Sequence, residues 1–336
     1  MTDRTAVQPS TTDRPDRGPG AQRAGTARAP RRYGDSVFRW LSTGSAASIM
    51  AILAGVALFL IVKALPAIGA NWSTNPDLTG GTTAGNASLW QYVGPLIWGT
   101  LFSSLIALVL GAPVAVGIAL FISHYAPRRL ANVLGYLVDL LAAVPSVVFG
   151  LWGIFVIRPF IIPIQDWLNA YLGWIPLFDG PVSRTGSTIL AGAVVLAVMI
   201  LPIISSIARE IFLRTPRLHE EAALALGATK WEMIRMAVLP HARSGMVSAT
   251  LLGLGRALGE TMAVALIISP SLIFSAKLIT DSANSQTIAA NIALNFPESN
   301  PLQRDALIAT GLALFVISLA VNMIARLVIR RGAGGR

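Results

Sequence analysis

The chain has 336 residues, of which 54 % are hydrophobic and only 12 % are charged. Soluble domains carry about 25 % charged residues, so this composition excludes a soluble globular protein and indicates one that crosses the bilayer several times. The absence of cysteine excludes disulfides, thiolate metal sites and cysteine nucleophiles. The formal net charge is +10. The basic residues are concentrated in the expected cytoplasmic loops, as described below, so the charge is explained by membrane topology and does not predict nucleic-acid binding.

The motifs of catalysis and metal binding are also missing from the sequence. His219-Glu220 begins an H-E-x-x-H pattern, but Ala223 stands at its fifth position, so the zinc motif is incomplete. None of the three lysines follows a glycine, so the chain has no phosphate-binding loop for ATP. We therefore expect no catalytic residue, no metal site and no cofactor in this chain.

In chain order, residues 1–35 are rich in Arg, Pro, Thr and Gly and predict a disordered cytoplasmic tail. Residues 36–336 predict one all-α membrane domain. Its first apolar run has 20 residues, enough to cross a hydrocarbon layer of about 30 Å, and is expected to be retained as an anchor. Six spans are expected in all, near residues 46–65, 99–121, 132–157, 188–208, 246–269 and 306–325.

The basic residues predict the orientation of these spans. With both termini in the cytoplasm, the inside segments hold 21 of the 26 lysines and arginines. They are divided as eight in residues 1–45, two in 128–129, seven in 209–256 and four in 326–336. Cytoplasmic loops are enriched in basic residues, so we expect an even number of spans with both termini in the cytoplasm.

Residues 215–240, between the fourth and fifth spans, form a segment that we call the elbow. Thr215-Pro216 is a typical helix start, and Gly227 is a typical helix end because glycine adopts the left-handed conformation cheaply. Thr229 and Glu232 have the spacing of a capping box, which predicts a second helix that ends by Pro240. On these features alone, the helix–turn–helix can equally be an ordinary interfacial hairpin.

The fifth span contains two charged residues near its centre. Arg256 and Glu260 are four residues apart, so on one helix they share a face and can pair. Each would cost about 3 kcal/mol if it faced lipid, so both are expected to face a neighbouring helix, a cavity or each other. Gly255 and Gly259 form a G-x-x-x-G pattern, which permits close helix approach. Two interpretations remain: a packing ion pair, or an Arg256 that binds an anionic substrate through its parallel N–H groups.

The third span contains Pro145-Ser146. The proline predicts either a simple kink or a short unwound segment lining a cavity, in which Ser146 would donate a hydrogen bond to an anion. Asp139 precedes this point and is expected to pair with a basic residue near the cytoplasmic side; its role stays open.

The elbow resembles the EAA loop of ATP-binding-cassette importer permeases. The pattern is Glu221-Ala222-Ala223-x-x-x-Gly227 followed by Leu239-Pro240, with Ala237 where the family usually has isoleucine. The resemblance implies the type I importer permease fold, a location in the plasma (inner) membrane of a bacterium, and a separate ATPase subunit that holds ATP and Mg. The residues implied in docking that subunit are Glu221, Ala222, Ala223, Gly227, Leu239 and Pro240.

The sequence Arg256-Ala-Leu-Gly-Glu-Thr-Met262 resembles the R-A-x-G-E-T element of phosphate importer permeases. Sulfate and molybdate permeases commonly have G-E-F there, so Thr261 favours phosphate. The run from Ala143 to Gly153, and methionine after Gly-Glu-Thr, are similar to PstC-type rather than PstA-type permeases. The resemblance covers residue 46 to the end and implies a substrate pathway that includes Arg256, Glu260 and Thr261. Ser146, next to the expected kink or break at Pro145, is the further candidate for this pathway.

The partners implied by this resemblance are a homologous PstA-type permease, an ATPase dimer, an extracytoplasmic phosphate-binding protein, inorganic phosphate and the lipid bilayer. Three alternatives remain open: a permease for sulfate, molybdate or phosphonate; an ion-coupled secondary transporter with Glu260 or Asp139 as proton carrier; and a membrane enzyme, for which no nucleophile or metal motif is present.

Overall fold

The computed structural model describes residues 33–72 and 88–333. The expected tail, 1–35, lies outside the described residues except for its last three, which are helical and begin α1. The chain forms two compact units, Met1–Leu53 and Ala54–Arg336. The described part of the first unit is the beginning of α1, and its side chains from residue 36 onward are exposed.

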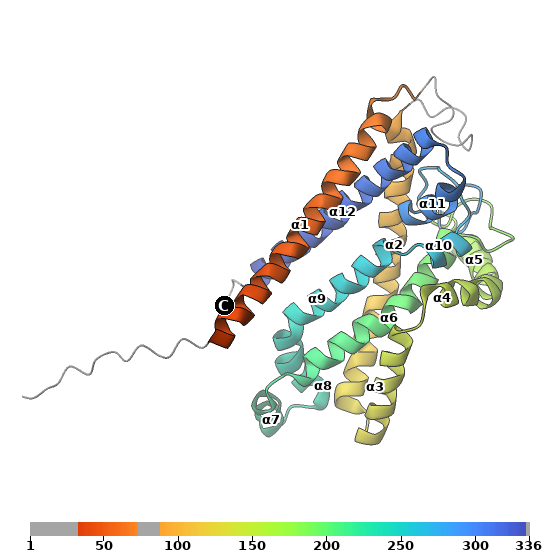
Figure 1. The fold of residues 1–336 in the computed structure, drawn as a ribbon. Helices are drawn as coiled ribbons and strands as arrows, with labels where there is room; N and C mark the ends of the chain where they lie inside the picture. The colour runs from red at the N-terminus through yellow and green to blue at the C-terminus, as the bar shows by residue number, and fades with distance from the viewer. Residues whose placement is uncertain (1–32, 73–87, 334–336) are drawn as a thin grey trace, which may run out of the picture. The chain divides into compact units, whose positions relative to one another are not determined.

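The described residues are helical apart from loops and one isolated β-bridge, Leu272 with Ser285 (Figure 1). The π turns are Phe121–Tyr125, Gly153–Ile157 and Ile234–Val238, and a 3₁₀ turn spans Phe296–Glu298. The α-helices are α1 (Tyr33–Gly69), α2 (Leu89–Leu120), α3 (Arg128–Ala142), α4 (Ser146–Trp152), α5 (Arg158–Leu172), α6 (Ile189–Leu213), α7 (Arg217–Ala225), α8 (Lys230–Met233), α9 (Leu239–Leu258), α10 (Met262–Ile267), α11 (Ile288–Asn295) and α12 (Pro301–Ala333).

Five segments of the described chain are long and apolar enough to cross a membrane. Four of them contain most or all of an expected span but extend beyond it, because their helices continue past the apolar core into the polar flanks. The five segments are Ser36–Gly69, Leu89–Tyr125, Ser146–Leu172, Ile189–Leu213 and Pro301–Leu327.

The core of the second unit is the packing of α6 between α2 and α9. Glycines make the close approach possible: a Cβ on Gly253 would lie 2.6 Å from Ile204, and one on Gly245 would lie 2.7 Å from Ile211. These two glycines, eight residues apart on α9, bring it against α6. By contrast, a Cβ on Gly255 would meet nothing within 4 Å, so the expected Gly255/Gly259 face packs against no helix among the described residues.

Prolines account for the positions of the three π turns. Pro159 and Pro240 each come two residues after a π turn, at the start of α5 and α9, and Pro127 follows the turn that ends α2. A proline has no N–H and its ring clashes with the carbonyl four residues earlier. A wider turn before the proline relieves both problems, so the helix continues through Pro240 instead of ending by it as the sequence predicted.

The expected third span, 132–157, is not one helix. The chain leaves the helical conformation between Ala142 and Ser146, where Pro145 has a ψ of 138°. Residues 128–142 form the separate helix α3, and the membrane-length segment begins at Ser146 and continues to Leu172. The break therefore corresponds to an unwound segment rather than a simple kink, because a residue before proline disfavours the α conformation.

The expected fifth span, 246–269, is also broken. The helix α9 ends at Leu258, and the six-residue α10 begins at Met262. Gly259 is a weak helix former, and Thr261 Oγ1 donates to the Gly259 carbonyl at 3.2 Å, which stabilises the non-helical link. The break changes the surroundings of both charged residues in this segment.

Candidate functional site

The glycine turn of the elbow has the local geometry that its sequence predicts. Gly227 lies in the left-handed region with φ of 84°. Its N–H bonds to the Leu224 carbonyl at 3.0 Å, and the N–H of Ala228 bonds to the Ala223 carbonyl at 3.2 Å. These two bonds are the Schellman arrangement that ends a helix, so the predicted glycine turn after α7 is confirmed.

The start of α8 is held by a complete capping box. Glu232 accepts from the backbone N–H of Thr229 at 2.8 Å, and Thr229 Oγ1 accepts from the Glu232 N–H at 3.3 Å. The predicted cap at Thr215 is wrong, because Pro216 occupies the N-cap position of α7. Thr215 Oγ1 is instead buried without a hydrogen-bond partner among the described residues.

The inner face of the elbow is anchored on the ends of the long helices. Met233, Ile234 and Val238 are buried with Phe212 of α6 and Ala119 of α2, and Ala223 and Leu239 pack against this cluster. The inner face of the elbow is therefore packed directly on the ends of α2 and α6.

The outer face of the elbow is exposed and apolar. Leu226 is 90 % exposed and Leu218 74 %, and Glu221 and Ala222 are also exposed. A hollow of about 760 Å³ beside the Gly227 turn is lined by Ala222, Ala223, Gly227 and Pro240, among others. Exposed apolar residues around a hollow are typical of a protein interaction surface.

A contact between a histidine and a carboxylate, which the sequence did not predict, joins the elbow to α2. His124 Nε2 in the π turn after α2 lies 3.6 Å from Glu220 Oε1 on α7. Ser123 Oγ lies 2.7 Å from His124 Nδ1, on the other side of the ring. The two residues are 96 positions apart, so no local pattern signals this contact.

The expected pairing of Arg256 with Glu260 is absent. None of the ion pairs among the described residues contains either residue, because the helix breaks after Leu258 and leaves Arg256 on α9 and Glu260 in the link before α10. Glu260 is 5 % exposed and accepts from the N–H of Ala263 at 3.1 Å. It therefore stabilises the N-terminus of α10, where a carboxylate is favoured by the unpaired N–H groups and the helix dipole.

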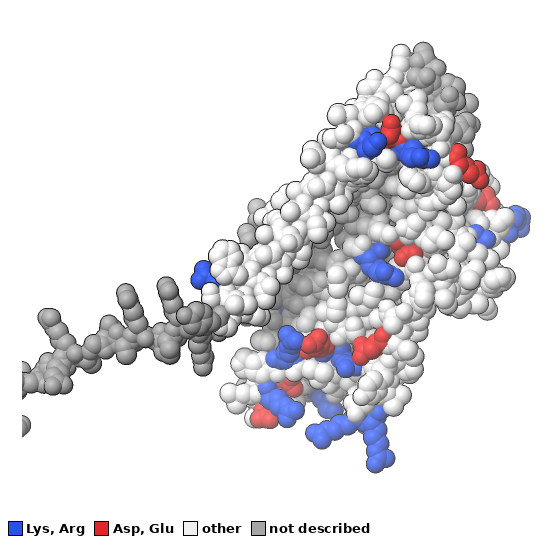
Figure 2. Space-filling view, in the orientation of Figure 1, with Lys and Arg blue, Asp and Glu red and all other residues white. Residues whose placement is uncertain are grey.

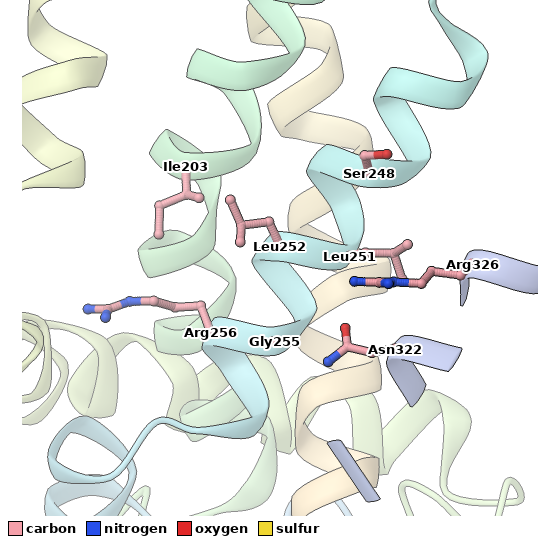
Figure 3. Close-up of a pocket in the computed structure, with 8 residues that line it drawn as sticks. All are labelled: Ile203, Ser248, Leu251, Leu252, Gly255, Arg256, Asn322 and Arg326. Atoms are coloured by element: carbon pink, nitrogen blue, oxygen red, sulfur yellow. The ribbon is translucent and has the colours of Figure 1, made fainter. Parts of the chain in front are cut away.

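Arg256 is exposed and lines a cavity of about 610 Å³ between α6, α9 and α12. The other polar residues that line this cavity are Ser248, Asn322 and Arg326. In Figure 3, Arg326 reaches from α12 toward Leu251, whereas the Arg256 side chain extends away from α12. Asn322 and Arg326 are more than 60 residues from Arg256 in sequence, and only the packing of α12 on α9 reveals their proximity.

The remaining expected site residues lie apart from this cavity. Ser146 is the first residue of α4 and half-buried, and Thr261 lies in the link before α10. Neither lines the cavity of Arg256. Asp139 is exposed on α3, and the ion pairs among the described residues do not include it, so its expected basic partner is not found.

The charges of the second unit are unevenly distributed. Figure 2 shows lysines and arginines gathered at the end that carries α3, α7 and α8, with a largely uncharged middle on the visible face. A second, smaller group of charges lies at the other end. An uncharged band between two charged ends is typical of a protein embedded in a bilayer.

Comparison with known proteins identifies the family of the chain. Residues 111–333 match the family described as "Binding-protein-dependent transport system inner membrane component". The "Phosphate transport system permease protein PstC 2" of Mycobacterium tuberculosis is 47 % identical over 310 residues, which cover 91 % of this chain and 94 % of that protein. The PstC protein of Mycobacterium leprae is 46 % identical over 283 residues, 83 % of this chain and 87 % of that protein.

Solved structures share the fold at low sequence identity. A bacterial ABC transporter involved in the import of alginate gives a TM-score of 0.58 at 17 % identity, covering 89 % of this chain and 98 % of that chain. The MetNI methionine ABC transporter gives 0.51 at 15 % identity, covering 72 % and 96 %. With its motifs, its all-helical membrane fold and these relatives, the chain belongs to the binding-protein-dependent transport system inner membrane components, and among them to the PstC-type phosphate transport permeases, which are non-catalytic subunits.

Proposed function

We propose that this chain forms one half of the pathway by which an ATP-driven importer moves inorganic phosphate into the cytoplasm, with Arg256 as the residue that contacts the ion. The observation that carries this proposal is the position of Arg256, exposed in a cavity between three helices and free of any carboxylate partner among the described residues. An arginine in a membrane segment is costly, and an unpaired one is best explained by an anionic ligand.

The chemistry of the cavity suits phosphate. A guanidinium donates two parallel hydrogen bonds to two oxygens of a tetrahedral anion. Ser248, Asn322 and Arg326 line the same cavity and add polar groups and a second positive charge to its wall, although the Arg256 side chain extends away from them in this structure (Figure 3). Glu260 is not a counter-ion in this arrangement, since it stabilises the start of α10, and Thr261 and Ser146 would meet the ion only elsewhere along the path.

The energy for transport would come from a separate ATPase dimer that holds ATP and Mg. Its docking site is the exposed face of the elbow, including Glu221, Ala222 and Gly227, with Leu239-Pro240 at the start of α9. The buried cluster beneath the elbow supports this role, because it links the docking surface directly to α2, α6 and α9. ATP-driven closure of the ATPase would thereby tilt the helices that surround Arg256.

The proposed topology has six crossings with both termini in the cytoplasm, in the plasma membrane of a bacterium. Five crossings are the membrane-length segments described above. The remaining one, fifth in chain order, is the broken segment α9–α10 that follows the elbow; it is too polar to be counted among those five. The gathering of basic residues at the end of α3, α7 and α8 supports a cytoplasmic position for that end.

Two further partners complete the proposal. A homologous PstA-type permease would complete the pathway from the open side of the cavity that Gly255 and Arg256 line, where a Cβ on Gly255 would meet nothing within 4 Å. An extracytoplasmic phosphate-binding protein would deliver the ion at the opposite end from the elbow. In a related fold, the alginate transporter was solved in complex with a substrate-bound periplasmic protein.

The test is uptake of labelled phosphate by the assembled complex in proteoliposomes, with ATP hydrolysis recorded in parallel. Arg256→Ala should lower uptake about 10- to 100-fold, the scale of a lost charge-assisted hydrogen bond, while ATP hydrolysis persists. The matched control is Arg129→Ala, which also removes one arginine but lies on the exposed start of α3. It should transport phosphate normally.

Other results would identify other functions. Normal phosphate uptake by Arg256→Ala would remove Arg256 from the pathway. Parental uptake of sulfate, molybdate or phosphonate in place of phosphate would change the substrate, and uptake by this chain without nucleotide would indicate an ion-coupled transporter.

A further inference from the structure

A second polar cavity lies at the opposite end of α10 from Glu260. Its volume is about 420 Å³, and it is lined by the start of α5, the loop before α6 and the segments at and after the end of α10. In Figure 1, α5 and α10 are drawn far from the elbow helices α7 and α8. The polar residues that line the cavity are Arg158, Thr185, Ser187, Ser269, Asp281 and Ser282.

Arg158 is held in place by the end of α10. Its Nη2 donates to the carbonyls of Leu266 and Ile267 at 2.8 and 2.9 Å, and these are carbonyls that a helix leaves unpaired at its C-terminus. Both bonds use the same nitrogen. The Nε atom is buried and has no hydrogen-bond partner among the described residues, so the guanidinium is fixed in position yet keeps unused donors.

Asp281 is also held in place, on another wall of the cavity. Its Oδ2 accepts from Ser183 Oγ at 2.8 Å and from Thr185 Oγ1 at 3.3 Å. The turn that carries these hydroxyls contains Gly186, whose φ of 69° and contact with Arg158 allow the turn to lie directly on the arginine. The carboxylate is thus positioned by hydroxyls rather than by a cation.

Arg158 and Asp281 line one cavity but form no ion pair with each other or with any other described residue. Opposite charges that share a cavity would normally pair, so the space between them suits a ligand that binds both. Such a ligand must accept hydrogen bonds from a guanidinium and hydroxyls, and must also donate one to a carboxylate. Phosphate meets both conditions because it keeps a proton on one oxygen at neutral pH, whereas sulfate has no proton to donate.

We propose that this cavity is a second phosphate site, which accepts the protonated oxyanion before it reaches Arg256 and rejects oxyanions that lack a proton. The inference rests on the proposed transport function and adds a site to it. Arg158 and the hydroxyls would bind the oxygens, Asp281 would accept the hydrogen bond from the protonated oxygen, and α10, capped by Glu260 at one end and Arg158 at the other, would separate this site from Arg256.

The first test is Asp281→Asn in the assembled complex, with labelled phosphate uptake, ATP hydrolysis and added external sulfate as the three readouts. The amide still accepts from Ser183 and Thr185 but also donates, so it should lower phosphate uptake about ten-fold and make the residual uptake sensitive to millimolar sulfate. Asp179→Asn is the matched control, since Asp179 is an exposed carboxylate paired with Lys277 outside the cavity; it should match the parent.

The inference is overturned by parental uptake in Asp281→Asn, or by reduced uptake that sulfate leaves unchanged. Either result would mean that Asp281 only organises the loop before α6.

A second pair of variants tests the site without changing Asp281, whose substitution could also disturb the loop before α6. Ser269 lines the cavity and its side chain makes no hydrogen bond among the described residues. Ser269→Asp adds a negative charge and should reduce phosphate uptake about ten-fold below that of Ser269→Asn, a neutral side chain of similar size, because the charge repels the anion. Equal uptake by the two variants would contradict the site.

These results are separable from the test of the pathway. If Arg256→Ala abolishes uptake and the Asp281 and Ser269 variants behave as the parent, only the second site fails. If the cavity variants respond as expected while Arg256→Ala transports normally, the second site stands and the assignment of Arg256 fails.

Discussion

Arg256 and Glu260 illustrate how one local break reassigns two charged residues. On a continuous helix their spacing of four would place them side by side. The break at Gly259 instead directs Glu260 to the N–H of Ala263 and leaves Arg256 in the cavity of α6, α9 and α12. The carboxylate therefore has a structural task, and the guanidinium remains available to a substrate.

This separation predicts that the two residues contribute independently to stability. Glu260→Ala should destabilise the complex by about 1 kcal/mol, as the loss of an N-terminal cap does. Arg256→Ala should have a small effect, and in the double variant the shifts of the thermal unfolding midpoint should add, because uncoupled residues are additive within about 0.5 kcal/mol. The double-mutant cycle is measured on the purified complex. A coupling free energy clearly above about 0.5 kcal/mol would show that the two residues do form an ion pair.

At the scale of elements, the Gly227 turn sets the angle between α7 and α8 and hence the shape of the docking surface. Its left-handed conformation, with φ of 84°, costs a non-glycine residue about 1–2 kcal/mol. Space does not restrict the position, because a Cβ there would meet nothing within 4 Å. Any effect of substitution therefore arises from backbone strain or from a docked partner.

Gly227→Val and Gly227→Asn separate these two causes. Valine is strained in the left-handed region, whereas asparagine tolerates it. Valine should uncouple ATP hydrolysis from phosphate uptake, and asparagine should retain more of the coupling. The measurement is the ratio of phosphate transported to ATP hydrolysed; a valine variant with the parental ratio would remove the turn from the docking surface.

The capping box of α8 predicts a dependence on pH. Hydrogen bonds from the Thr229 backbone N–H and hydroxyl lower the pKa of the Glu232 carboxyl below its ordinary range. A lowered pKa means that the stabilisation is complete above the ordinary pKa of a glutamate, about 4.3, and is lost as pH falls through the still lower value in the folded protein.

Hydrogen exchange of the α8 amides, corrected for intrinsic rates, measures this effect. Exchange should be faster in Glu232→Gln than in the parent at pH 7, and the difference should shrink as the carboxyl of the parent becomes protonated. Glu210→Gln, an exposed carboxylate of α6, is the control and should leave α8 unchanged. Identical exchange in Glu232→Gln and the parent at pH 7 would contradict the capping role.

At the scale of the whole molecule, the proposed topology predicts which loops face which side. Because the natural chain has no cysteine, a single introduced cysteine is labelled uniquely. Arg129→Cys lies on the exposed start of α3 and Trp174→Cys in the loop after α5, where the side chain is 80 % exposed. A membrane-impermeant maleimide should label the cysteine at 174 in intact cells, and the one at 129 only after permeabilisation. The reverse pattern would invert the topology.

The sequence by itself determined the features that depend on neighbouring residues. The Gly227 turn and the Thr229–Glu232 box need only hydrogen bonds between residues three to five apart, and the apolar composition required a membrane protein of several spans. Three local expectations were still wrong. Pro216 rather than Thr215 caps α7, the helix continues through Pro240 because a π turn precedes it, and the break after Leu258 separates Arg256 from Glu260.

Only the tertiary structure decided the environment of each charged residue. The breaks before Ser146 and after Leu258 depend on packing as well as on Pro145 and Gly259, and α10 is held from outside by Arg158, more than 100 residues away. Tertiary packing also brings Arg326 into the cavity of Arg256, and Asp281 into the cavity of Arg158. The physical reason is that an ionisable group in a membrane protein is positioned by the partners that the fold brings close to it, away from water. Those partners can lie far away in the sequence, so local sequence patterns do not reveal them.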